Sequence, residues 1–372
     1  MVQHKKIIIV GAGPAGIGLG ILLKKLGFTS YLILEGDEIG SSFRRWPREM
    51  RFITPSFTGQ GFGALDLNAV TPHTSPAFTF RKEHLNGDDY ADYLELLTEH
   101  FELTVKEHTR VTAVSKKEHL FTVETESERW TCEALFWATG EFQFPQVTGI
   151  EGAHHGLHVG QVDAYEALAK DHYVVIGGGE SGADAAFHLA RYGNQVTVVT
   201  EKSMKDKVVD PSLTLSPYTY ERMEVAMQSG RVSFKENRKV TKIEHHHGGY
   251  DIELDNGEVI QTTGKPILAT GFASGARQIA SLFEWQENGK PLLTEEADES
   301  TITEGLFLTG PSVQHRSAVF CFIYKFRARY AAIVKQLFRR WGYDLKEEVI
   351  AEYEDNQMLL EDLACCEVNC EC

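Results

Sequence analysis

Two glycine-rich motifs carry most of the chemistry that this sequence of 372 residues can support. Each has the pattern Gly-x-Gly-x-x-Gly, at residues 11–16 and 177–182, and each follows a short apolar run. The first glycine of such a motif allows a tight turn, the second lets the backbone approach a pyrophosphate, and the third lets a helix pack on a strand. The phosphates then lie at a helix N-terminus, where unpaired N–H groups favour negative charge. The predicted dinucleotide contacts are Gly11, Gly13, Pro14, Ala15 and Gly16 in the first motif and Gly177, Gly179, Glu180, Ser181 and Gly182 in the second.

An acidic residue follows each motif at the end of a second apolar run. Glu35 and Glu201 both stand 19 positions after the third glycine of their motif. A carboxylate at about this spacing accepts hydrogen bonds from the ribose hydroxyls of a dinucleotide. Two complete units of this kind predict two dinucleotides in one chain, with electrons passing between them.

The elements around the two motifs repeat in the same order. Each copy reads as strand, glycine turn, helix and second strand, followed by a small antiparallel sheet and a strand that ends in Ala-Thr-Gly. A later strand at residues 305–310 lacks a glycine motif and is expected to return to the first copy. We therefore predict an α/β fold of two Rossmann-like domains, the second inserted into the first. The expected boundaries are 1–145 with 300–345 for the first domain, 146–299 for the second, and 346–372 for an acidic, cysteine-rich tail.

The charge and the length of the apolar runs argue against a nucleic-acid-binding or membrane-spanning protein. The formal net charge is −16, and no basic cluster suggests nucleic acid or an anionic membrane as a partner. The longest apolar runs have the length of strands and are far too short to span a bilayer. The first apolar run leads directly into the glycine turn, which favours a buried strand over a signal peptide. A soluble, cytoplasmic protein is expected.

The six cysteines are unevenly placed. Four of them, Cys365, Cys366, Cys370 and Cys372, lie in the last eight residues, and no Cys-x-x-Cys follows either glycine motif. Closely spaced thiols can bind a soft metal or act as a redox shuttle, and an inert acidic tail is equally compatible with the sequence. Their spacing is not that of the usual structural zinc sites, and no metal is predicted.

These elements resemble the flavin-containing monooxygenase-like group of two-dinucleotide-binding flavoproteins, over roughly residues 5–340. The resemblance implies FAD in the first domain, NAD(P)H in the second, and Ala-Thr-Gly strands that act as hinges. Residues 305–311 are similar to a late FAD motif that meets the ribityl and pyrimidine side of the flavin, although Pro311 replaces the usual acidic residue. Residues 40–44 and 51–55 match two further family segments in part, whereas residues 154–158 depart from the signature Phe-x-Gly-x-x-x-His. The further flavin contacts implied are Ser42, Phe43, Trp46, Thr54, Val111, Ala138, Thr139, Gly140, Gly310 and Pro311.

Glu201 bears on the choice between NADH and NADPH. Its charge would repel the 2′-phosphate of NADPH. Lys202, Lys205 and Lys207 follow it and would offset that repulsion, so both coenzymes stay open. The alternative interpretation is that Glu201 only ends a strand in solvent and does not contact the coenzyme. Lys202 is counted with Glu201 among the predicted NAD(P) contacts.

The resemblance implies an FAD-dependent NAD(P)H oxidoreductase, with molecular oxygen and a small molecule as its substrates. Monooxygenases of this group insert one oxygen atom through a flavin hydroperoxide, and the cofactors carry that chemistry, so no catalytic residue is predicted. The sequence is also similar to thioredoxin-reductase-like reductases of small disulfides, some of which carry a cysteine at the position of Ala15. A disulfide or quinone reductase and a flavin redox sensor therefore remain alternatives. A homodimer is compatible with the sequence.

Overall fold

A computed structural model describes residues 2–58, 65–203 and 214–363 of the chain. The chain divides into two compact units. Within the described residues, the first unit comprises residues 2–44, 54–58, 65–141 and 274–363, and the second comprises residues 45–53, 142–203 and 214–273. Three segments thus group with a different unit from the one expected: residues 274–299 with the first unit, and residues 45–53 and 142–145 with the second.

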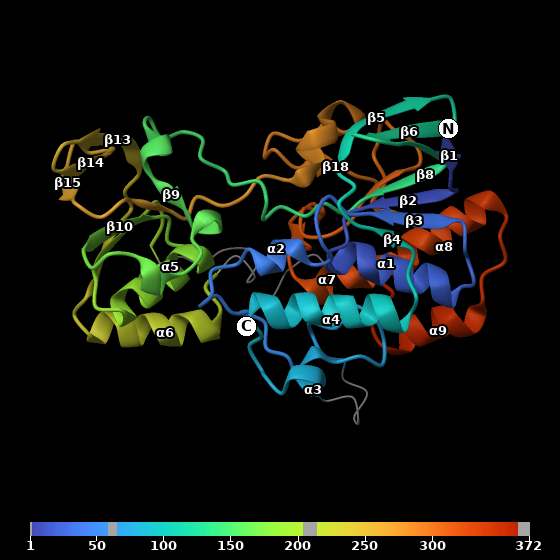
Figure 1. Cartoon of the computed structure of the whole chain (residues 1–372), viewed down its shortest axis with the longest axis horizontal. Helices are drawn as coiled ribbons and strands as arrows, with labels where there is room; N and C mark the ends of the chain where they lie inside the picture. Colours follow the sequence, from blue (N-terminus) through green and yellow to red (C-terminus); the bar gives the residue numbers. More distant parts are fainter. Residues whose placement is uncertain (1, 59–64, 204–213, 364–372) are drawn as a thin grey trace. The chain divides into compact units, whose positions relative to one another are not determined.

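A parallel sheet of five strands forms the centre of the first unit (Figure 1). Its order is β19 (Leu306–Leu308), β8 (Ala134–Trp137), β2 (Ile7–Val10), β3 (Tyr31–Leu34) and β4 (Val105–Lys106). The three inner strands are buried throughout, which is typical of parallel strands that are covered on both faces. Helix α1 (Pro14–Lys25) packs on β2 and β3 and also contacts helices α4 (Gly87–His100), α7 (Ile323–Phe326) and α8 (Tyr330–Trp341).

A second, four-stranded sheet of the first unit has the order β1-β7-β6-β5. Its strands are β1 (Gln3–His4), β5 (Val111–Lys117), β6 (Leu120–Thr125) and β7 (Arg129–Cys132). The β5–β6 pair is antiparallel, as predicted, and β7 also pairs with β6 in the antiparallel direction. The remaining elements are α2 (Ser41–Arg44), α3 (Pro76–Phe80), α9 (Glu347–Asp355), and the hairpins β17–β18 (Glu284–Trp285, Pro291–Leu292) and β20–β21 (Gln314–His315, Ala318–Val319).

The second unit repeats the parallel arrangement. Its sheet runs β12 (Val232–Glu236), β11 (Gln195–Thr200), β10 (His172–Ile176), β16 (Ile267–Leu268) and β9 (Leu157–His158). Helix α5 (Glu180–Arg191) packs on β10 and β11 and contacts α6 (Pro217–Gln228). An antiparallel sheet of β13 (Val240–His246), β14 (Gly249–Leu254) and β15 (Val259–Thr262) completes the unit. The predicted fold class is confirmed.

The strand orders explain where each glycine motif lies. In the first unit the chain leaves β2 for β3 on one side and later returns to β8 on the other. In the second unit β10 has the same place between β11 and β16. Each motif therefore follows the carboxyl end of the strand at which the order reverses, where open α/β sheets bind their ligands.

No helix within the described residues is long and apolar enough to cross a bilayer.

Candidate functional site

The first glycine motif forms a backbone cradle whose three glycines have different surroundings. Gly11 has φ +108°, and a Cβ atom there would lie 2.5 Å from the carbonyl oxygen of Ala138. A Cβ atom at Gly16 would overlap the carbonyl oxygen of Gly11. The backbone of the protein therefore leaves no room for a side chain at either position. A Cβ atom at Gly13 would meet no described heavy atom within 4 Å. Gly13 thus leaves open space at the start of α1, where a bound pyrophosphate would fit.

The second motif has the same geometry. Gly177 has φ +112°, and a Cβ atom at Gly177 or Gly182 would overlap a backbone carbonyl oxygen. Gly179 again faces open space among the described residues. Both Gly13 and Gly179 are N-cap residues with no side-chain hydrogen bond to the helix that they begin. Each helix therefore offers backbone N–H groups that a phosphate can accept from.

Glu35 lies at the carboxyl end of β3, beside the first cradle. Its Oε2 accepts a hydrogen bond from the backbone N–H of Ala12 at 2.7 Å, and its Oε1 accepts one from Asp37 at 2.9 Å. Burial raises the pKa of the Glu35 carboxyl, against the opposing effect of these two N–H donors. The bonds fix the side chain, and a carboxylate has further lone pairs with which to accept from ribose hydroxyls.

Glu201 and Lys202 follow β11 in the second unit, and both are exposed. The backbone N–H and carbonyl of Lys202 are both bonded to the Thr200 hydroxyl, which shapes the turn. Lys205 and Lys207 lie outside the described residues. Glu180 is held by the protein, because its Oε1 accepts from the backbone N–H of Ser216 at the start of α6.

The predicted hinge and the late motif meet at the edge of the first sheet. Residues 138–140 follow β8, and the N–H of Thr309, after β19, donates to the carbonyl of Trp137 at 3.1 Å. Gly310 has φ +104°, and a Cβ atom there would lie 3.7 Å from the Cβ of Ala15. Pro311 follows and is half-buried. The first cradle and the late motif are therefore adjacent, as one dinucleotide would require.

Other predicted flavin contacts are spread over the first unit. Ser42 and Phe43 lie on α2, which packs on α4, and the ring of Phe43 lies 4.8 Å from that of Tyr90. Thr54 is buried, and its carbonyl accepts from the Asn68 side chain at 2.9 Å. Val111 begins β5.

Trp46 belongs to the second unit, whereas the other predicted flavin contacts belong to the first. Its ring lies 4.9 Å from that of Phe52 and 6.4 Å from that of Phe142. The buried carboxylate of Glu49 anchors this segment by accepting from the backbone N–H groups of residues 165 and 166 at 3.1 and 3.0 Å. Burial alone would raise the pKa of Glu49, but these N–H bonds, the backbone N–H of Glu49 itself and the nearby His188 together lower the pKa. The sequence did not predict this contact of Glu49.

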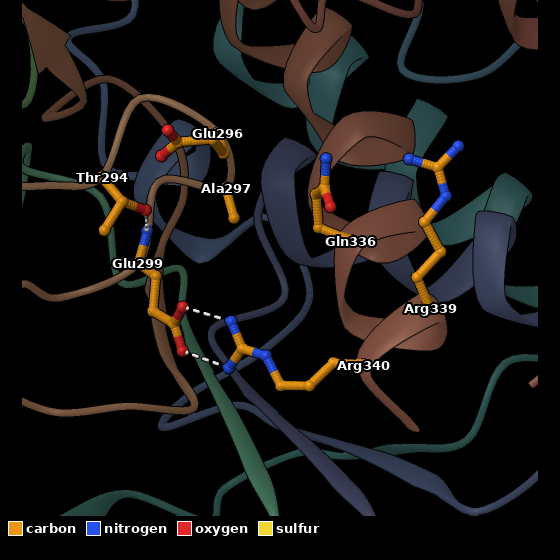
Figure 2. A pocket seen from close by; sticks show the side chains of 7 residues that line it. All are labelled: Thr294, Glu296, Ala297, Glu299, Gln336, Arg339 and Arg340. Carbon is orange, nitrogen blue, oxygen red and sulfur yellow. Dashed lines mark hydrogen bonds and ion pairs between the residues drawn. The ribbon is translucent and has the colours of Figure 1, made fainter. Parts of the chain in front are cut away.

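A pocket of about 550 Å³ also lies in the first unit, and none of the residues that line it is a predicted cofactor contact. Figure 2 shows Glu299 and Arg340 facing each other. Their two N–O distances are 2.7 and 2.6 Å. The pocket is lined by Thr294, Glu296, Ala297, Glu299, Gln336, Arg339 and Arg340. Its one buried carboxylate, Glu299, is thus neutralised within the protein.

The part of the chain that the structure describes contains no group of three or more histidine, cysteine or acidic residues that could hold a metal ion. Two cysteines lie in this part of the chain: Cys132 is buried, and Cys321 is partly exposed. Burial raises the pKa of the Cys132 thiol strongly. The four tail cysteines at positions 365, 366, 370 and 372 lie outside the described residues.

Comparison with known proteins gives matches along most of the chain. The chain is 25% identical to the bacilliredoxin reductase Bdr of Bacillus subtilis, over 91% of this chain and 99% of Bdr. It is 29% identical to the uncharacterized oxidoreductase CzcO of Bacillus velezensis, where the match spans only half of each protein (50% and 51%). The structure of a flavin-containing monooxygenase from Stenotrophomonas maltophilia superposes with a TM-score of 0.71 at 15% identity, covering 91% of this chain and all of the other.

The chain belongs to the pyridine nucleotide-disulphide oxidoreductase family, whose sequence profile matches residues 8–310. FAD and NAD(P)H are the cofactors that follow from this membership. The two open cradles fit them, because each presents backbone donors to a pyrophosphate and has room where a side chain would stand.

Proposed function

We propose that this family member is a monooxygenase, which uses NAD(P)H and dioxygen to insert one oxygen atom into a small molecule. Ala15 is the observation that carries the proposal. It is buried at the start of α1, next to Gly310, where related disulfide reductases can carry a cysteine. Without a thiol there, electrons would pass from the flavin to an acceptor directly. The likeness to the Stenotrophomonas enzyme supports the fold for this chemistry.

The residues of the chain would bind and orient the two cofactors. In the first unit, Gly13 and Glu35 would hold the pyrophosphate and the adenosine ribose of FAD. In the second unit, Gly179 would admit the pyrophosphate of NAD(P)H. Bound FAD supplies the chemistry by accepting a hydride and passing electrons to oxygen. NAD(P)H is oxidised to NAD(P)⁺, one oxygen atom enters the substrate, and the other leaves as water.

The test follows the fate of oxygen. Protein reduced anaerobically with NADPH is mixed with isotopically labelled dioxygen and an organic sulfide, a nucleophilic probe. The proposal expects labelled sulfoxide in an amount comparable to the NADPH oxidised. Release of all the oxygen as hydrogen peroxide or water, with the sulfide left unchanged, would contradict it.

A second candidate is an NAD(P)H-dependent disulfide reductase, which the match to nearly the whole of Bdr favours. Anaerobic reoxidation of the reduced protein by glutathione disulfide tests this candidate. A reductase should be reoxidised rapidly, and the rate should fall when Cys321 is replaced by serine or when residues 364–372 are removed. Slow reoxidation that is indifferent to both changes would reject it.

A further inference from the structure

Two buried hydroxyl groups close to Gly310 have no hydrogen-bond partner among the described residues. Thr309 and Ser312 are each only 3% exposed. Neither the Oγ1 of Thr309 nor the Oγ of Ser312 bonds to any described residue. Burying a hydroxyl without a hydrogen-bond partner is energetically unfavourable, and native proteins rarely do so. Two of them within four residues indicate that a group other than the described residues supplies their partners.

The place of these hydroxyls in the fold points to the FAD of the first unit. Thr309 follows β19, at the sheet edge where β8 and β2 also end. The intervening Gly310 lies against Ala15 of the first cradle. The backbone N–H of Val313 donates to the carbonyl of Gly310 at 3.2 Å, which curls the chain into a turn after this contact. Both hydroxyls thus belong to the segment that adjoins the cradle.

A buried ionic cluster holds this segment in place. Asp298 and Arg329 are 0% and 1% exposed, with 2.8 Å between Oδ1 and Nη2. The same Oδ1 lies 2.7 Å from Nε2 of His315, just beyond the turn. The carbonyl of Asp298 accepts from the N–H of Leu308, just before the turn, at 3.0 Å. Such a cluster is costly to disrupt. Its contacts with Leu308 and His315 therefore hold the chain before Thr309 and after Ser312.

We propose that the hydroxyls of Thr309 and Ser312 hydrogen-bond polar atoms of bound FAD. These two side chains stand on either side of Gly310 and Pro311, the pair predicted from sequence, and they supply polar groups that Pro311 lacks. The inference rests on the FAD of the family and holds whether the enzyme is an oxygenase or a reductase.

Replacing each hydroxyl by an apolar group separates a ligand contact from a structural one. Thr309→Val and Ser312→Ala should each raise the dissociation constant for FAD about five- to tenfold, the usual effect of one lost hydrogen bond. The melting temperature of the FAD-free protein should stay the same or rise, because each change removes an unsatisfied polar atom. FAD affinity is measured by flavin fluorescence, and melting by circular dichroism.

Two further variants serve as controls. Thr309→Ser keeps the hydroxyl and should bind FAD within twofold of the unaltered protein. Thr98→Val removes a buried hydroxyl that donates to the Leu94 carbonyl at 2.9 Å within α4; it should lower the melting temperature and leave FAD affinity unchanged. An unchanged FAD affinity in Thr309→Val and Ser312→Ala would overturn the proposal. A lower melting temperature of their FAD-free forms would do so too, because buried water would then be the partner.

Discussion

The two units share one glycine cradle but differ in the acidic residue beside it. In both, the first and third glycines are closed by backbone carbonyls, and the second faces open space. Glu35 is half-buried and accepts from two backbone N–H groups, whereas the equally spaced Glu201 is exposed beyond its strand. The same motif therefore comes with a fixed carboxylate in one unit and a solvated one in the other.

This difference suits the two roles that the family implies. A carboxylate that is already held in place loses little conformational entropy when a ligand binds, which favours tight, lasting binding of FAD. An exposed carboxylate must be ordered on binding, which is compatible with a coenzyme that enters and leaves in each turnover. We expect the first unit to retain its dinucleotide through purification and the second to exchange it.

The largest effect is expected from Gly13→Val. A Cβ atom at this position would meet no described heavy atom within 4 Å, so the fold should persist while the pyrophosphate of FAD is blocked. The purified protein should be colourless, with FAD affinity reduced at least about a hundredfold. Far-ultraviolet circular dichroism and flavin absorbance check both statements. Gly16→Val is the contrasting variant: its side chain would overlap the Gly11 carbonyl, and it should fail to fold. A yellow, folded Gly13→Val protein would refute the first cradle as the FAD site.

Gly179→Val tests the same position in the second unit. The protein should keep its FAD, and the concentration of NAD(P)H that half-saturates flavin reduction should rise about tenfold or more, equivalent to about 1.4 kcal/mol. Anaerobic stopped-flow absorbance measures the change. Loss of flavin from Gly179→Val, with flavin retained in Gly13→Val, would mean that the two units have been assigned the wrong way round.

The order of elements was predictable because strand, turn and helix are encoded locally. The apolar runs and glycine spacing predict β2, α1, β10 and α5 within a few residues of their observed bounds. The segment of residues 45–53 could not be placed, because Glu49 is fixed by N–H groups 116 and 117 positions away. Equally, nothing local distinguishes Asp298 and Arg329 from solvated charges, although they form a buried pair. In both cases the structure depends on partners that are far away in the sequence.

Glu201→Gln should produce a smaller effect on coenzyme choice. Removing the charge removes its repulsion of the 2′-phosphate, so the preference should shift toward NADPH by about fivefold, the equivalent of about 1 kcal/mol. The ratio of kcat/KM for NADPH to that for NADH measures the shift, with Glu236→Gln, at the end of β12, as a comparison variant. An unchanged ratio would show that Glu201 does not face the ribose.

The smallest effect concerns the pH dependence of the FAD-free protein. Burial raises the pKa of Glu35 above its value in the unfolded chain. Between those two pKa values the folded state binds more protons, so this residue makes stability fall as pH rises through that range. Glu35→Gln should remove this part of the slope. Melting temperature against pH measures it, and identical slopes for both proteins would contradict a raised pKa.

The central claim, that the chain couples a retained FAD to an exchangeable NAD(P)H, is tested most directly by anaerobic reduction of the unaltered protein. The purified, yellow protein is mixed with increasing NADPH or NADH while the visible flavin absorbance is followed. We expect complete bleaching at a rate that saturates with coenzyme concentration. Protein that lacks flavin even after incubation with FAD, or flavin that neither coenzyme bleaches, would contradict the account.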